Sequence, residues 1–321
     1  MRGPPDDADR GLLGLVATLL DPGGAGGGAG GAASGAADGD RAPATAGATL
    51  DPARVRRHLL APLAHRAGFP GFRSDYIAAA LHAERRAGFL AEVLGAFGDL
   101  PVLRLKGIAY IATLYDDPAE RPMTDIDLLV PGPRFAEAAG RLRALGYVDD
   151  GKRNQRSAAN HAVTFRRRES AIDLHRSMVQ RGRMALDLDA VWWNATPLPD
   201  GSLVADPTSQ YLIHLAHMAR QEFAVPLIAF ADAARLVARL SGPPPAGAWG
   251  LARAHRLLEA YLEALGRARL LELAVFPGVL ELLRGELPPR WLQILRKVAI
   301  HDRPRDLLGL AGASLRTRLG V

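Results

Sequence analysis

The sequence predicts a mixed α/β fold of the α+β type, in which a small mixed β-sheet is flanked by helices. Residues 51–98 show the spacing of apolar residues that is typical of helices. Short apolar runs then alternate with helical patterns over residues 99–205, and helical spacing returns over residues 206–321. A chain of 321 residues that is 48% hydrophobic and 23% charged is also long and apolar enough to bury a core.

The N-terminal part is expected to contain one short helix and one flexible segment. Residues 1–21 include an amphipathic stretch, from Asp9 to Leu20, that predicts a helix. Residues 22–50 are rich in Gly and Ala, and burial of such small side chains cannot offset the entropy lost on ordering. Asp51-Pro52 then combines a favourable N-cap with a favourable first helical residue, so the helical region over 51–98 is expected to begin there.

Four strands and two helices are predicted within residues 99–205. The strand-like runs are short, apolar and bounded by turn residues, and they cover 101–105, 124–130, 161–167 and 170–176. Arg168-Glu169 separates the last two runs, which predicts a hairpin. The helical stretches are 106–117 and 135–147, the second with Gly146 as its C-cap.

Composition excludes several kinds of site. The chain has no cysteine, so it has no disulfide, no thiolate metal site and no cysteine nucleophile. Its formal net charge is +6 and its pI is about 10.0, which is compatible with anionic partners but selects none of them. The early apolar run Gly11–Leu20 is too short for a membrane span and follows acidic residues, so no membrane association and a cytoplasmic location are expected.

The stretch RPMTDIDLLV, Arg121 to Val130, places two carboxylates inside a strand-like apolar run. Alternate residues of a strand point to the same face and lie about 6.5–7 Å apart, so Asp125 and Asp127 are expected to project together. Two like charges on a half-buried face are costly unless a cation compensates them. Carboxylate oxygens suit Mg²⁺, which predicts a metal site.

A third acid strengthens this prediction. Asp173 lies in AIDLH, another apolar strand-like run, with His175 on the same side of it. If the two strands are neighbours, Asp125, Asp127 and Asp173 can hold two Mg²⁺ ions, or Mn²⁺ in their place, about 3.5–4 Å apart. The alternative is that the three acids are unrelated structural residues.

A phosphate site is predicted upstream of these acids. Lys106-Gly107 joins a strand to a helix, where free N–H groups, a close backbone approach and a positive charge favour an anion. Arg121 could reach the same phosphates. The alternatives are that Lys106 is a surface residue and that Arg121 forms a structural ion pair with an acid nearby in the sequence, namely Asp116, Asp117 or Glu120.

Three further residues are candidates for the acceptor side of the site, and they are His161, His175 and Arg166. His175 could instead be a packing residue, and Arg166 belongs to a basic set that could be a solvated face. His214 and His217 lie one helical turn apart without a third ligand at fixed spacing, so packing is favoured over a zinc site.

The order of these motifs resembles the nucleotidyltransferase superfamily of DNA polymerase β-like fold, and within it the bacterial branch of uncharacterised nucleotidyltransferase family proteins. The resemblance is carried by LKG, LYDDP, RPMTDIDLLV, LGY and IDLH, and it is densest over residues 101–176. It implies a nucleotidyltransferase core over residues 99–205. Many members of the superfamily carry Gly-Ser in the turn, whereas this chain has Lys106-Gly107, as is typical of the branch it resembles.

The resemblance implies transfer of NMP from an NTP donor with Mg²⁺. Asp125 and Asp127 would bind both ions, and Asp173 would complete the ion on the acceptor side. The acceptor is not specified, but a small molecule, peptide or protein is favoured over RNA, because aromatic stacking partners are scarce near the basic set. The alternatives are transfer of another group, such as a sugar, from an activated nucleotide, and a non-catalytic nucleotide- or peptide-binding module.

Overall fold

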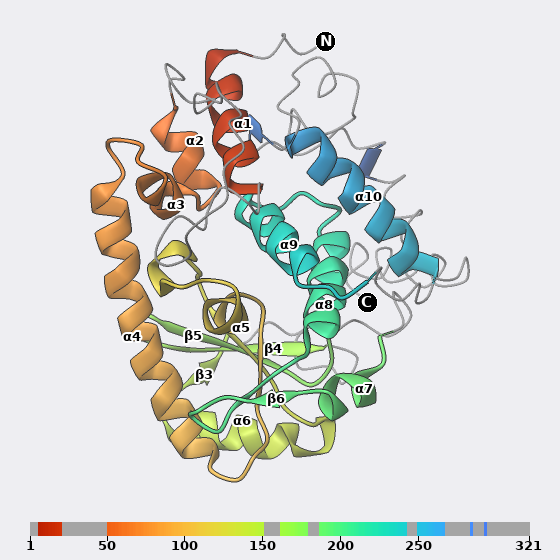
Figure 1. The fold of residues 1–321 in the computed structure, drawn as a ribbon. Coiled ribbons are helices and arrows are strands. Elements are labelled where there is room, and N and C mark those ends of the chain that lie inside the picture. The colour runs from red at the N-terminus through yellow and green to blue at the C-terminus, as the bar shows by residue number, and fades with distance from the viewer. Residues whose placement is uncertain are drawn as a thin grey trace, which may run out of the picture.

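A central β-sheet organises the fold (Figure 1). The computed structural model describes residues 6–20, 50–150, 161–178, 186–242, 249–266, 283–284 and 292–293. Within these residues the sheet has seven strands in the order β3-β4-β5-β2-β1-β7-β6, and it contains both parallel and antiparallel pairs. The predicted α+β class with a mixed sheet is therefore confirmed. The predicted Gly/Ala-rich segment falls almost entirely outside the described residues.

The strands are short. Their bounds are β1 (Leu103–Leu105), β2 (Ile126–Leu129), β3 (Val148–Asp149), β4 (Ala162–Arg167), β5 (Ser170–His175), β6 (Thr196–Pro197) and β7 (Leu203–Val204). The predicted hairpin is confirmed, because β4 and β5 are antiparallel and meet at Arg168, whose φ is +51°. The two-residue strands β3, β6 and β7 were not predicted, since two residues are too few to show an alternating pattern.

Helices account for most of the remaining described chain. Their bounds are α1 (Asp7–Leu20), α2 (Pro52–Arg57), α3 (Ala61–Arg66), α4 (Arg73–Phe97), α5 (Lys106–Thr113), α6 (Phe135–Ala144), α7 (Leu188–Trp193), α8 (Pro207–Arg220), α9 (Ile228–Ala238) and α10 (Trp249–Gly266), with the 3-10 helices η1 (Pro118–Glu120) and η2 (Gly132–Arg134). Asp51 caps α2 as predicted, because its side chain accepts hydrogen bonds from the backbone N–H groups of Ala53 and Arg54. None of the described helices is both long and apolar enough to span a membrane.

One face of the sheet is covered by α4 and α6 and is apolar (Figure 1). Ile126 and Leu128 of β2 lie in the same buried cluster as Ile172 and Leu174 of β5. The intervening residues of these strands, among them Asp127, therefore point to the opposite face, because successive side chains of a strand alternate. Helices α7 and α8 lie on that side, because Val191 and Ile213 share a buried cluster with Leu129 of β2, and α5 lies beside α8.

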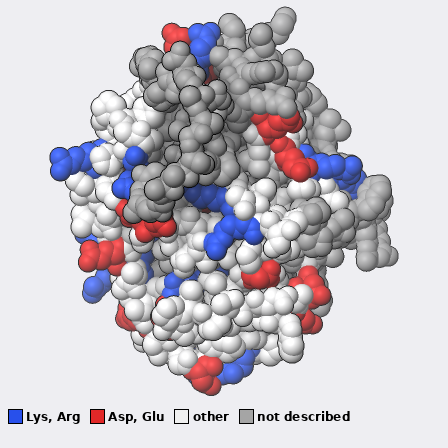
Figure 2. Space-filling model, in the orientation of Figure 1, with Lys and Arg blue, Asp and Glu red and all other residues white. Residues whose placement is uncertain are grey.

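A layer of helices lies beyond this second face. Helix α1 contacts α9 and α10, and α8 contacts α9 and α10, so that elements from both ends of the described chain share one buried cluster (Figure 1). Asp9 of α1 is fully buried and is paired with Arg54 and Arg284 at N–O distances of 2.6 and 2.9 Å. Figure 2 shows the outer surface from the same direction, where the described basic and acidic side chains are interspersed.

Candidate functional site

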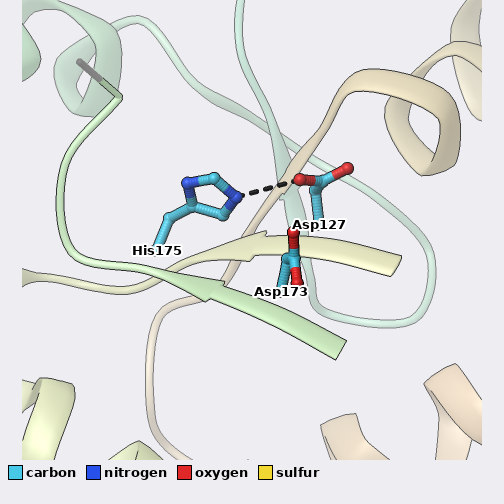
Figure 3. Close-up of side chains that lie close together, drawn as sticks. All are labelled: Asp127, Asp173 and His175. Atoms are coloured by element: carbon cyan, nitrogen blue, oxygen red, sulfur yellow. Dashed lines mark hydrogen bonds and ion pairs between the residues drawn. The ribbon is translucent and has the colours of Figure 1, made fainter. Parts of the chain in front are cut away.

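The site begins with two neighbouring strands. β2 and β5 are parallel, and Asp127 is in register with Asp173, as is Leu129 with His175. Parallel neighbours are about 4.8 Å apart, and residues in register point to the same side of the sheet. Asp127, Asp173 and His175 therefore project together from adjacent strands (Figure 3).

Asp127 is the most tightly held of the three. It is 4% exposed, and its Oδ1 accepts hydrogen bonds from Lys106 Nζ at 2.5 Å and from His175 Nε2 at 2.9 Å. Burial by itself would raise the pKa of this carboxyl group, but the charge of Lys106 and the hydrogen bond from His175 outweigh burial and hold the pKa well below its usual range. Asp127 is therefore ionised throughout the physiological pH range.

Asp173 and His175 carry polar atoms whose hydrogen-bonding capacity is unused. Asp173 Oδ1 and His175 Nδ1 are both buried, and neither has a hydrogen-bond partner among the described residues. A buried carboxylate oxygen without a partner is costly, and a metal ion is one way to compensate it. Asp127, Asp173 and His175 each offer a ligand atom, and these atoms lie within 4.8 Å of one another, so the donor set fits a metal ion.

Asp125 lies beside this cluster, not within it. It precedes the first residue of β2 and is half-buried. Its pKa is raised, first by burial and then by the negative charges of Asp127 and Asp173, with Lys106 acting in the opposite direction. The three predicted acids are thus close enough for their charges to repel. The compact cluster, however, consists of Asp127, Asp173 and His175, and His175 was predicted from the sequence to lie on the acceptor side.

The turn that carries Lys106 and Gly107 has an unusual backbone. Lys106 is the first residue of α5 and has a φ of +49°, a conformation that non-glycine residues seldom adopt. A Cβ on Gly107 would lie 3.3 Å from the Cβ of Met123, so a side chain there would crowd the segment that leads into β2. The turn directs Lys106 Nζ to Asp127, which places a positive charge directly beside the acids.

Arg121 has an acidic partner that is distant in the sequence. Its guanidinium binds the fully buried carboxylate of Asp232 in α9, with Nε–Oδ2 and Nη2–Oδ2 distances of 2.8 and 2.7 Å. Tyr115 donates a further hydrogen bond of 2.7 Å to Asp232 Oδ1. The side chain of Arg121 therefore joins the segment before β2 to α9. Two of the acids suggested from the sequence have other contacts, since Asp117 binds Tyr76 and Glu120 pairs with Arg66.

The two remaining acceptor-side candidates lie in different surroundings. His161, just before β4, has its ring centroid 5.7 Å from that of His175 and so lies next to the cluster. Arg166 is exposed on β4, and no described contact joins it to the cluster. The other basic residues before His161, Lys152, Arg153 and Arg156, lie outside the described residues.

Helix α8 contributes residues that the sequence did not identify as part of the site. Arg220, in its last turn, donates a hydrogen bond of 3.3 Å from Nη1 to His161 Nε2, and it is close enough to Asp127 and Asp173 to feel both charges. His217 lies one turn earlier and near Lys106. His214, predicted as a packing residue, bonds Tyr110 and the carbonyl of Ala229. These contacts could not be predicted from the sequence, because they depend on how α8 packs over the sheet.

The geometry can be compared with known proteins. A search of curated proteins found no match to the chain. Residues 54–272, more than half of the chain, match the family model described as "Uncharacterised nucleotidyltransferase". This match includes the sheet, the carboxylate cluster and α8. The chain therefore belongs to this nucleotidyltransferase family.

Proposed function

We propose that this protein is a metal-dependent nucleotidyltransferase that moves NMP from an NTP to a hydroxyl or phosphate acceptor. The observation that carries the proposal is the placement of Asp127 beside Asp173 on adjacent parallel strands, with a buried Asp173 oxygen that lacks a partner, in a chain of this family. In this reaction an acceptor oxygen forms a bond to the α-phosphorus of the NTP. The bond between the α-phosphorus and the oxygen that bridges the α- and β-phosphates breaks, and pyrophosphate leaves.

Asp127 and Asp173 would hold Mg²⁺ or Mn²⁺, with Asp125 beside them and His175 as a further available ligand. Such ions supply positive charge that stabilises the phosphates and the attacking oxygen. His175 contributes in a second way, because its Nε2–H bond to Asp127 fixes the orientation of that carboxylate. The proposal includes two ions, although the compact three-residue cluster by itself supports one.

Lys106 and Gly107 are proposed to bind the donor phosphates. Lys106 Nζ lies 2.5 Å from Asp127 Oδ1, so its charge is already beside the metal-binding carboxylate, and α5 presents its N-terminus at the same turn. When the donor binds, Lys106 would exchange part of its contact with Asp127 for a phosphate oxygen. Arg121 has no part in this proposal, because its guanidinium is occupied by Asp232.

The acceptor is proposed to approach from the side of His161 and His175, with Arg166 farther out on β4. A small molecule, peptide or protein is favoured over RNA. The described basic side chains on the face in Figure 2 are interspersed with acidic ones, whereas a nucleic-acid-binding surface usually gathers basic residues into a patch or stripe.

The test is a nucleotide-turnover assay with a matched pair of variants. Purified protein is incubated with each labelled NTP, Mg²⁺ and a cell extract as the source of acceptor, and pyrophosphate release is measured together with the mass of any labelled product. Asp127→Asn is compared with the wild type and with Asp189→Asn, which removes an exposed carboxylate on α7. Asp127 would hold the ion that stabilises the developing negative charge, and loss of one such stabilising interaction typically costs about 100-fold or more. Asp127→Asn should therefore lower turnover at least that much.

The outcomes separate the alternatives. Pyrophosphate release that disappears in Asp127→Asn but not in Asp189→Asn, with a product heavier by one NMP, supports the proposal. In a parallel incubation with a labelled nucleotide sugar in place of the NTP, a product heavier by the sugar would assign a different group to the transfer. Nucleotide binding without consumption would indicate a non-catalytic module, and undiminished turnover in Asp127→Asn would refute the metal-site assignment.

A further inference from the structure

We propose that Arg220, in the last turn of α8, binds a phosphate group of the donor nucleotide. This inference rests on the proposed function. It assigns a substrate contact to the helical region after the sheet, and it identifies the ligand of that contact as the metal-bound triphosphate of an NTP.

The path of α8 brings Arg220 to the site. Thr113 at the end of α5 donates a hydrogen bond of 3.2 Å to Gln210, and Tyr110 bonds His214 at 2.9 Å, so α8 runs beside α5 toward Lys106. His217, one turn further along, is near Lys106, and Arg220 follows it. Arg220 bonds His161 Nε2 at 3.3 Å, and the His161 ring lies 5.7 Å from that of His175 in the cluster. The charges of Asp127 and Asp173 act on Arg220 from the same side. Figure 1 shows α5 and α8 on the same side of the strands.

Arg220 has no carboxylate partner in the described part of the chain. Its hydrogen bond there is the one to His161 Nε2, which uses one of five guanidinium N–H donors. The side chain is nonetheless half-buried, and burial lowers the pKa of the guanidinium. A half-buried cation with no carboxylate in direct contact retains unused hydrogen-bond donors, so this position favours an anion that the protein itself does not supply.

Arg121 and Arg220 can be compared by the partners of their guanidinium groups. Arg121 is also largely buried, but it has a complete set of partners in Asp232 and the carbonyl of Pro122. Arg220 instead faces acids without touching them, because Asp127 and Asp173 influence its pKa but neither forms an ion pair with it. The two arginines therefore differ in whether the fold supplies their anion.

The charges are arranged in two layers that match a metal–triphosphate complex. The sheet contributes the carboxylates of Asp127 and Asp173, which suit the metal ion, and α8 contributes the guanidinium of Arg220, which suits phosphate oxygens through bidentate hydrogen bonds. Lys106, at the start of α5, bonds Asp127 of the sheet and acts on the pKa of His217 in α8. A metal–triphosphate complex could therefore bind the carboxylates through its metal ion and the guanidinium of Arg220 through its phosphate oxygens.

The test measures nucleotide affinity on the full chain without requiring turnover. Calorimetry with MgATP, MgGTP, MgCTP and MgUTP identifies the NTP that the wild type binds, and its dissociation constant is then measured for Arg220→Ala, Arg220→Gln and Arg220→Lys. Arg256→Ala is the matched control, since Arg256 is exposed on α10 of the same helical region. The corresponding nucleoside, which lacks phosphate, is titrated in parallel. Thermal unfolding establishes that each variant is folded.

Arg220→Ala and Arg220→Gln should weaken NTP binding by about tenfold to a hundredfold, which is the effect of losing hydrogen bonds to a charged group. Arg220→Lys should recover part of the affinity, because it retains the charge but not the bidentate geometry. Nucleoside binding, and NTP binding by Arg256→Ala, should remain at the wild-type level.

The inference is overturned if folded Arg220→Ala and Arg220→Gln bind the NTP as tightly as the wild type, if nucleoside binding falls equally, or if the wild type binds none of the four nucleotides. Failure of the proposed function has a different signature. Arg220-dependent NTP binding without any group transfer would refute the transferase activity and leave this contact intact, whereas transfer that needs Asp127 but with unchanged NTP affinity in the Arg220 variants would refute this contact alone.

Discussion

The two faces of the central sheet are built from the same strands, and they differ in chemistry around the centres of β2 and β5. On the face covered by α4 and α6, Ile126 and Leu128 of β2 pack with Ile172 and Leu174 of β5. One residue along each strand, the other face presents Asp127, Asp173 and His175. The first face is satisfied by apolar contacts, whereas the second buries polar atoms that lack partners in the described protein. The difference supports the proposal that the second face binds a ligand.

Two buried ion pairs support the same contrast. Arg121 and Asp232 satisfy each other with the help of Tyr115, as expected of a structural pair. Lys106 and Asp127 are also close, but the neighbouring Asp173 has an oxygen without a partner, and like charges raise the pKa of Asp125. Carboxylates that raise the pKa of a neighbour and leave a buried oxygen without a partner are typical of a site that binds metal.

The largest effect on turnover is expected from a substitution on the polar face. Asp173→Asn should lower turnover about 100-fold or more, because the variant loses a proposed metal ligand. The same change should leave the free energy of unfolding equal or higher, since it removes a charge that repels Asp125 and breaks no hydrogen bond in the described chain. The assay of nucleotide turnover and urea unfolding measure the two quantities. Wild-type turnover, or a clear loss of stability, would contradict this view of Asp173.

The adjacent residue provides the converse experiment on the apolar face. Ile172 is fully buried against the α4 and α6 side, so Ile172→Ala should lower the free energy of unfolding by about 2–5 kcal/mol. Turnover per folded molecule at low temperature should be unchanged, because the side chain points away from the site. If Ile172→Ala abolishes turnover while it remains folded, the two faces are coupled and the comparison fails.

The smallest effect concerns pH and the helical layer over the polar face. Burial lowers the pKa of His214, which bonds Tyr110 and the Ala229 carbonyl, and of His58, which accepts the N–H of Leu227. A histidine whose folded pKa is below its unfolded value of about 6.5 stabilises the fold above that pH. Stability should therefore decline as the pH falls below about 6.5.

Urea unfolding between pH 8 and pH 5 measures this decline. In His58→Gln, part of the slope below pH 6.5 should be absent, because Gln does not titrate, even though the variant is less stable overall. A wild-type stability that stays constant or rises as the pH falls would show that His58 and His214 are not held neutral by the fold.

Local patterns in the sequence were sufficient for the four longer strands and the hairpin, and they placed Asp127 and Asp173 on two of those strands. In β2 and β5 one acid lies between two apolar residues, so the acid could be assigned to the face opposite its neighbours before any tertiary contact was known. The cap at Asp51 was equally readable, because an N-cap involves only the next few residues. These features depend on a few consecutive residues, and for that reason the sequence by itself determined them.

The tertiary structure decided which of these residues meet. The parallel register of β2 and β5 places Asp127 beside Asp173, and the packing of helices joins Arg121 to Asp232 and brings Arg220 over the acids. None of these pairings follows from local periodicity, because each joins segments that are far apart in the chain and come together only when the helices and the sheet bury their apolar faces. The sequence determined the carboxylates, and long-range packing decided their cationic neighbours.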